Sequence, residues 1–203
     1  MNKFKKLIPK LNKQTILKIN QTLKSFELLN QKNNLYWFNE LCFCILTANS
    51  KAETAIKIQI EMHPDGFLKK TSTEIAMTIR KYGHRFHNTK ARFILYARKY
   101  MAIKTILQKQ PLETHRIFLV KNIKGLGYKE ASHFLRNVGY SNVAIIDRHI
   151  LKFMLQNKLI SQIPKTITPK KYLEYENILK NFDIPLNKLD LIIWAKMTGK
   201  VLK

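Results

Sequence analysis

Apolar residues recur at every third or fourth position along most of the chain, which is the spacing expected of amphipathic α-helices. The first long stretch, residues 11–31, places Ile16, Ile19, Leu23 and Phe26 on one stripe. The same spacing predicts helices over residues 35–48, 51–63, 71–83, 88–110, 113–121 and 128–137, others that begin near 147 and 168, and a last one that ends at 199. Because the pattern is helical almost throughout, the chain is predicted to be all-α.

Capping and breaking residues support several of these boundaries. Thr71 and Glu74 have the spacing of a capping box, and Asn88 is expected to cap a long basic helix that Pro111 ends. Thr168 and Pro169 are typical of a helix start, with proline at the first helical position. No repeat or flexible linker appears, so any division into lobes would have to arise from packing.

Composition agrees with a folded chain that binds a polyanion. The 203 residues are 45% hydrophobic, with only six Gly and six Pro. The 37 Lys and Arg exceed the 13 Asp and Glu, for a net charge of +24. This charge favours nucleic acid as the partner, with an anionic membrane surface as the second choice. We expect an intracellular, cytoplasmic protein associated with the nucleoid, because no apolar run is long enough for a membrane span and no secretory signal is present.

The two cysteines limit the possible metal chemistry. Cys42 and Cys44 lie two positions apart in an apolar stretch, which suits buried, reduced thiols. Two thiolates are too few for a four-cysteine zinc site or iron–sulfur cluster. We therefore predict no metal.

Two short helices joined by Gly125, Leu126 and Gly127 form a predicted hairpin. Glycines allow positive φ, and the free N–H groups at the start of the second helix can bind a DNA phosphate. An ordinary turn between two helices explains the same residues. On the second helix, Lys129, His133 and Arg136 share a face that is either solvated or turned toward a ligand.

Lys129 and Asp147 are the candidate catalytic pair. Lys129 lies in the first turn of its helix, and in a partly dry site its amine can act as a nucleophile. Asp147 follows an apolar run and precedes the next predicted helix. It is expected to cap that helix, and a carboxylate held ionised in this way can stabilise a cationic sugar and assist proton transfer.

These residues resemble a known family. Lys124-Gly125-Leu126-Gly127-Tyr128-Lys129-Glu130-Ala131, followed by Asp147-Arg148-His149, resembles the helix-hairpin-helix DNA glycosylase superfamily. The stretch from Lys129 to Gly139 is more specifically similar to the archaeal-type, or second-class, 8-oxoguanine DNA glycosylase/AP lyases. Leu46-Thr47-Ala48-Asn49, Gly83-His84-Arg85-Phe86 and the segment from Trp194 to Lys203 extend the resemblance over nearly the whole chain.

The resemblance implies a two-lobed fold with the active site between the lobes. It predicts one unit, residues 1–203, with a hairpin lobe at roughly 50–150 and a second lobe made of the N-terminal helices plus 151–203. It assigns Lys129 as the amine that attacks C1′ and forms a Schiff base, with Asp147 assisting, before β-elimination. No cofactor is needed. The partner is double-stranded DNA containing 8-oxoguanine, and the protein is expected to act as a monomer without a membrane.

For recognition of the base, the resemblance points to Phe86 and Trp194 as stacking surfaces. Core packing is the alternative for both, and without the resemblance it is the better explanation for Phe86 but less so for Trp194, which lies beside the chain end. It also assigns Lys203, the last residue, a role in selecting the lesion. Oxidation turns N7 of guanine into an N–H donor, to which a terminal carboxylate could bind. A frayed basic tail is the alternative.

Other residues are expected to contact DNA. Asn49 would fill the gap left by the flipped base, or cap a helix. His149 and its neighbour Arg148, together with His133, Gly125 and Gly127, are the remaining predicted contacts. Charge toward the DNA backbone is expected from Arg85, Lys90, Arg92 and Arg98.

Two other functions stay open at the level of the sequence. One is a glycosylase/lyase of the endonuclease III type that removes oxidised pyrimidines. The other is a helix-hairpin-helix module that binds duplex DNA without catalysis, in which Lys129 and Asp147 have no chemical role.

Overall fold

The computed structural model describes residues 3–203, and among these every regular element is helical. Three short 3-10 helices are η1 (Lys3–Leu7), η2 (Arg98–Tyr100) and η3 (Leu112–Thr114). The α-helices are α1 (Lys13–Gln31), α2 (Asn34–Thr47), α3 (Ala52–Met62), α4 (Gly66–Lys69), α5 (Ser72–Lys81), α6 (His87–Ala97), α7 (Ile103–Gln108), α8 (His115–Asn122), α9 (Tyr128–Asn137), α10 (Arg148–Gln156), α11 (Pro169–Lys180) and α12 (Leu186–Thr198). The all-α prediction is confirmed.

Local signals placed several helix starts correctly. The Thr71 side chain accepts from the N–H of Glu74, and the Glu74 carboxylate accepts from that of Thr71, which completes the capping box. Thr168 caps α11, with Pro169 at its first position. Asp147 caps α10 through its side chain.

The long helix expected over residues 88–110 is wrong. The chain forms α6, η2 and α7 instead, and α6 starts at His87 rather than after an Asn88 cap. Both α6 and α7 pack against α2. A straight helix of that length could not follow the side of α2, so the burial of residues such as Ile94 and Ile103 favours a bend between them.

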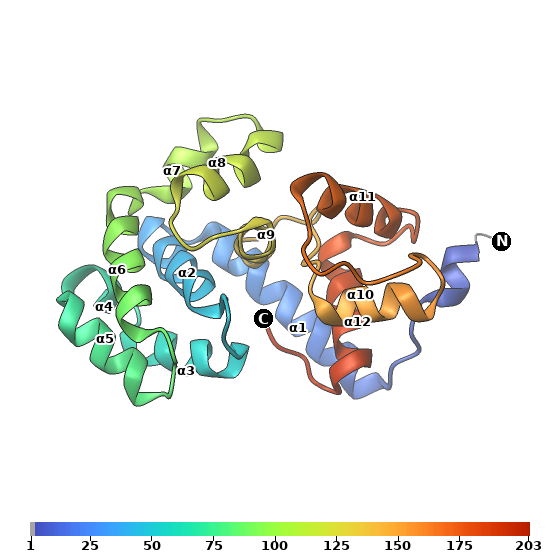
Figure 1. Cartoon of the computed structure of the whole chain (residues 1–203), viewed down its shortest axis with the longest axis horizontal. Coiled ribbons are helices and arrows are strands. Elements are labelled where there is room, and N and C mark those ends of the chain that lie inside the picture. Colours follow the sequence, from blue (N-terminus) through green and yellow to red (C-terminus); the bar gives the residue numbers. More distant parts are fainter. Residues whose placement is uncertain (1–2) are drawn as a thin grey trace.

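The core divides into buried clusters on either side of α9 (Figure 1). The larger cluster surrounds α2, whose residues 37–47 are all buried, and includes side chains from α3 to α9. A second cluster joins α10, α11 and α12, and a small third one packs α1 on α12. Within α1, Ile19 and Phe26 are buried whereas Ile16 is exposed. The division into lobes stays a prediction, although α2 packs with the elements of the expected hairpin lobe.

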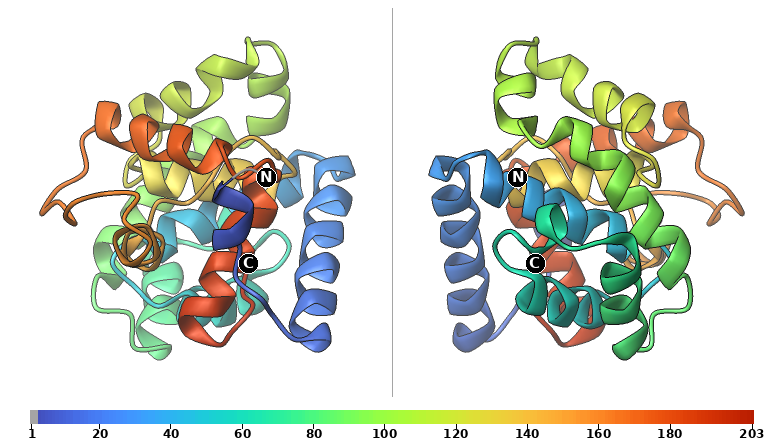
Figure 2. Two further views of the ribbon diagram at one scale, coloured as in Figure 1. Left: turned by 90° about the vertical axis from the view of Figure 1, so that its right-hand side faces the viewer. Right: turned by 90° about the vertical axis from the view of Figure 1, so that its left-hand side faces the viewer.

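The N-terminal segment closes the second cluster. Figure 2 shows η1 on the same side of the molecule as α12. The Phe4 ring lies 5.3 Å from the Phe182 ring, measured between centroids, in an edge-to-face contact. In the part of the chain that the structure describes, no helix is both long and apolar enough to cross a membrane.

Candidate active site

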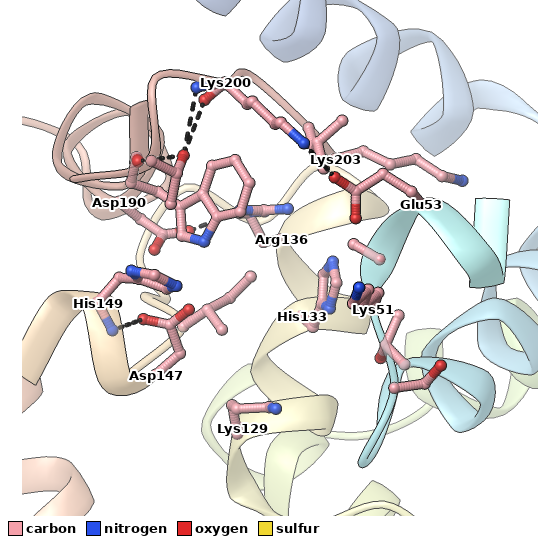
Figure 3. A pocket seen from close by; sticks show the side chains of 17 residues that line it. Lys51, Glu53, Lys129, His133, Arg136, Asp147, His149, Asp190, Lys200 and Lys203 are labelled. Atoms are coloured by element: carbon pink, nitrogen blue, oxygen red, sulfur yellow. Dashed lines mark hydrogen bonds and ion pairs between the residues drawn. The ribbon is translucent and has the colours of Figure 1, made fainter. Parts of the chain in front are cut away.

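A cavity of about 520 Å³ lies where α9 faces the starts of α3 and α10, the C-terminal half of α12 and the residues that follow it (Figure 3). Among its lining residues, five are basic and three are acidic. The basic ones are Lys51, Lys129, Arg136, Lys200 and Lys203, and the acidic ones are Glu53, Asp147 and Asp190. The cavity therefore brings together the two residues predicted for catalysis, Lys129 and Asp147, and two of those predicted for base recognition, Trp194 and Lys203.

The hairpin between α8 and α9 needs glycine at one of its two glycine positions. Gly125 has φ +89°, and a Cβ there would lie 2.6 Å from Cδ2 of Phe93. Gly127 has an extended backbone, so only Gly125 uses the freedom of glycine to take positive φ in this turn. Its N–H donates to Oε2 of Glu130 at 3.2 Å, so Glu130 already occupies one of the donors expected to face a phosphate.

Lys129 enters the cavity from the first turn of α9. Its side chain is 38% exposed, and its Nζ lies 3.2 Å from Oε1 of Glu130. Since Glu130 also binds the hairpin turn, the same carboxylate links the amine to the backbone before the helix. The amine is thus placed at a helix start, accessible from the cavity.

Asp147 faces this region from the start of α10 (Figure 3). Its Oδ1 accepts from the backbone N–H groups of His149 at 2.8 Å and Ile150 at 2.9 Å. Only Oδ1 takes part in the cap, so Oδ2 is available for chemistry and Asp147 can have both a structural and a chemical role. Beside it, the His149 ring lies 6.1 Å from the Trp194 ring between centroids, and both rings line the cavity.

Two of the three residues on the polar face of α9, His133 and Arg136, are buried. Arg136 and Asp190 form an ion pair of 2.6 Å between Nη1 and Oδ2, with side chains 4% and 2% exposed. Burial raises the pKa of Asp190 to about 6, and the Arg136 guanidinium opposes that rise. For Arg136 the solvated alternative is therefore wrong, and its ion pair joins α9 to α12.

His133 lies in the cavity wall one turn before Arg136. Its ring packs edge-on against Phe43, and among the described residues its buried Nε2 has no hydrogen-bond partner. Burial first, and then the charges of Arg136 and Lys129, hold the pKa of His133 well below its usual value. The imidazole is therefore neutral at pH 7.

Lys203 lies at the cavity with its side chain anchored. Its Nζ is 2.7 Å from Oε2 of Glu40, donates to Oε1 of Gln59, and lies 4.2 Å from the centroid of the Phe43 ring. The side chain is 28% exposed. Lys203 is therefore held in place by its side chain, and the alternative of a frayed tail is wrong for this residue.

Besides Gly125 and Gly127 in the hairpin, three predicted site residues lie outside this cavity. Phe86 is exposed before α6, where the Arg85 guanidinium lies 4.6 Å from its ring centroid. Asn49 is exposed after α2, with φ +60°. Arg148 is exposed at the start of α10 and lines a neighbouring groove, to which Lys129 and Asp147 also contribute.

Two of the four cations expected to face the DNA backbone are used inside the protein. Lys90 is buried and donates to the carbonyl of Ile45 at 2.7 Å, and burial lowers its pKa to about 8. Arg98 donates to the carbonyls of Phe67 and Lys70. Arg85 and Arg92 are exposed, as a backbone contact requires.

Metal ligands do not gather within residues 3–203: no group of three or more His, Cys, Asp or Glu side chains there could hold an ion. Cys42 and Cys44 are buried free thiols, which confirms the prediction made from their apolar surroundings.

Comparison with known proteins identifies the chain. The family model described as 8-oxoguanine DNA glycosylase matches residues 19–188. The chain belongs to the 8-oxoguanine DNA glycosylase family. A relative from Methanocaldococcus jannaschii named 8-oxoguanine DNA glycosylase/AP lyase is 50% identical over 190 residues, 91% of each chain. A relative of the same name from Aquifex aeolicus is 40% identical and covers 100% of this chain and 99% of its own.

Solved structures of this family confirm the fold. The Methanocaldococcus jannaschii 8-oxoguanine glycosylase/lyase in complex with 15mer DNA containing 8-oxoguanine matches with a TM-score of 0.92 and 47% identity, over 98% of this chain and 99% of that one. The Thermotoga maritima 8-oxoguanine DNA glycosylase matches with a TM-score of 0.86 and 39% identity, over 94% and 93%. The predicted helix-hairpin-helix glycosylase architecture is therefore confirmed.

Sequence reasoning missed Glu40 and Asp190, which are 2% exposed each. A signal for Glu40 exists: it interrupts an apolar helix, α2, whose residues around it are buried on every side. A charged residue in such a helix requires partners. The sequence does not reveal which partners those are.

Proposed function

We propose that this protein removes 8-oxoguanine from double-stranded DNA and then cleaves the strand, with Lys129 and Asp147 as the catalytic residues. The observation that supports this most is their placement on one cavity together with Trp194 and Lys203, in a chain of this family. Relatives with the same architecture carry the name 8-oxoguanine DNA glycosylase/AP lyase.

The chemistry starts at the Lys129 amine. In its neutral form the amine attacks C1′, the glycosidic bond breaks, and the base leaves with the bonding electrons and takes up a proton. Asp147 stabilises the positive charge that develops on the sugar and accepts the proton that the nitrogen releases. The resulting Schiff base acidifies C2′, whose proton is lost as the 3′ phosphate departs. No cofactor enters this sequence.

The base must leave the duplex to be reached, and flat side chains hold it outside. Trp194 supplies one such surface at the cavity. Phe86 can supply the other only if DNA binding brings it and the cavity closer together, because it lies outside the cavity in this structure.

Two polar groups read the base in this proposal. A main-chain oxygen of Lys203 accepts from N7–H of 8-oxoguanine, which guanine lacks. The second is His133, which also lines the cavity and whose buried Nε2 is unpartnered among the described residues.

Other contacts hold the DNA around the flipped nucleotide. Gly125 and His149 contact phosphates, and Gly127 does so only if its N–H leaves Glu130. Arg148 supplies charge beside them, and Asn49 occupies the gap in the duplex. Much of the affinity is independent of sequence, in keeping with a net charge of +24. In this proposal the protein acts as a monomer and is found at the nucleoid, where its DNA substrate lies.

Borohydride trapping tests the proposal. Reduction of the Schiff base should link the protein covalently to a duplex with 8-oxoguanine, and Lys129→Gln should abolish the adduct and lower strand cleavage by at least about 1,000-fold. Lys171→Met, which changes an exposed lysine on α11, is the matched control.

A panel of lesion duplexes separates the other functions. An adduct with oxidised pyrimidines in place of 8-oxoguanine would support the endonuclease III type of activity. Duplex binding with no adduct from any lesion would support the non-catalytic module and overturn the proposed chemistry.

A further inference from the structure

A buried polar chain joins the C-terminal residue to the helix that carries Lys129. Glu40, on α2, is at its centre: Oε2 binds Nζ of Lys203 at 2.7 Å, and Oε1 accepts from Nδ2 of Asn137 at 2.6 Å. Asn137 accepts in turn from the guanidinium of Arg136, which pairs with Asp190. The chain thus connects α12, α9, α2 and the residue at position 203.

The socket for the Lys203 ammonium is built on three sides. The Glu40 carboxylate and the Gln59 amide oxygen accept from Nζ, and the ring of Phe43 lies beneath it. Gln59 can turn only one way, because its Nε2 donates to Asn39 and to Glu40, which leaves its oxygen for the lysine. Such a set of acceptors selects a cation with several donors.

Glu40 is ionised in this socket although it is buried. Burial by itself would raise the pKa of Glu40, but the charge of Lys203 and the hydrogen bonds from Lys203, Gln59 and Asn137 hold it below its usual value. The side chain of Glu40 is 3% exposed. A buried carboxylate of this kind costs stability unless its partners are retained, so the contact with Lys203 is strongly favoured over solvation of the lysine.

We propose that Glu40 is a positioning residue for recognition of the base: it holds the Lys203 ammonium and thereby fixes the main chain of residue 203 against the cavity. The inference rests on the proposed function, in which that main chain reads the lesion. It assigns the two parts of Lys203 different tasks, since the side chain anchors the residue and the backbone contacts the base. Neither task requires Glu40 to touch the DNA.

The test compares base excision with cleavage of a preformed abasic site, which needs Lys129 but no base recognition. Lys203→Met retains every backbone atom and removes the anchor, and Glu40→Gln retains the shape of the socket and removes its charge. Each should lower kcat/KM for 8-oxoguanine duplexes by about tenfold or more, with abasic-site cleavage unchanged. The double variant should lose no more than Glu40→Gln alone, because Glu40→Gln already breaks the contact with Lys203 and also disturbs the hydrogen bonds from Asn137 and Gln59.

Controls separate this inference from the function on which it rests. Lys171→Met changes an exposed lysine paired to Glu174 and should leave both rates unchanged. Deletion of Lys203 removes backbone and anchor together and should also abolish excision. If deletion abolishes excision but Lys203→Met and Glu40→Gln leave its rate unchanged, the anchor is overturned and recognition by residue 203 stands.

Two further outcomes are decisive. If Glu40→Gln and Lys203→Met lower both rates in parallel, Glu40 supports the fold alone and the inference is overturned. If the parent protein cleaves abasic sites but never excises 8-oxoguanine, the proposed function fails before the socket is tested, and the inference fails with it. Should Glu40→Gln not fold, Lys203→Met carries the test alone, since its side chain is already partly exposed.

Discussion

The two sides of the cavity are held by different kinds of contact. On the side we call the catalytic edge, Lys129 and Asp147 lie at helix starts and are fixed by neighbours in the sequence, namely Glu130 and the backbone N–H groups after Asp147. On the recognition edge, His133 and Lys203 are held by residues distant in the sequence.

The difference has a physical reason. In the proposed function Lys129 is a nucleophile that must reach a sugar approaching from solvent, which agrees with its accessibility and its local support. Discrimination between two purines that differ at few atoms needs polar groups that cannot relax, and this favours side chains held by contacts with other elements. Three experiments test whether the two edges are as different as they appear.

The largest effect is expected where the buried polar chain is cut. Arg136→Met leaves Asp190 buried without its cation, and should lower the free energy of unfolding by about 3–5 kcal/mol in urea denaturation. Asp190→Asn in the same background should recover part of the loss, because it removes the unpaired charge. A change as small as that of the exposed Lys171→Met control, below about 0.5 kcal/mol, would show that the buried ion pair contributes no more to the free energy of unfolding than a surface residue does.

Asp147→Asn should separate capping from chemistry at the catalytic edge. Asparagine retains an oxygen for the N–H groups of His149 and Ile150, so stability should change by less than about 0.5 kcal/mol. Excision of 8-oxoguanine should fall by about 100-fold, because the negative charge beside the sugar is lost. Excision rates and urea midpoints measured on one preparation check both expectations; normal excision would reduce Asp147 to a helix cap.

The smallest effect concerns pH at the recognition edge. The pKa of His133 is lowered in the folded state by burial. Near pH 6.5 His133 therefore binds a proton in the unfolded chain but stays neutral in the folded chain. The stability contributed by neutral His133 is complete above that pH and is lost as the pH falls. Between pH 7.5 and 5.5 the loss should be about 1.4 kcal/mol.

His133→Gln should remove this part of the pH dependence. The comparison is between the urea midpoints of the parent and of the variant at the two pH values, so that other titrating groups cancel. Equal slopes for both proteins would mean that His133 is solvated and that the recognition edge is less buried than the structure indicates.

Local patterns predicted most of the fold and the catalytic edge. The capping box at Thr71, the cap at Asp147 and the hairpin around Gly125 depend on residues within a few positions of each other, and each was placed correctly. The expected helix over residues 88–110 failed because packing on α2, distant in sequence, bends the chain there. Helix propensity depends on local sequence and cannot predict a contact with a distant element.

The amino-acid sequence alone determined an all-helical, strongly basic chain with a lysine and an aspartate at two helix starts, because helical period, capping and net charge are local or summed properties. Only the tertiary structure decided that His133 and Arg136 on α9 are buried and that Glu40 meets Lys203, 163 positions away. Those contacts arise from burial of charges, whose partners must come from other elements since a buried charge cannot remain unpaired.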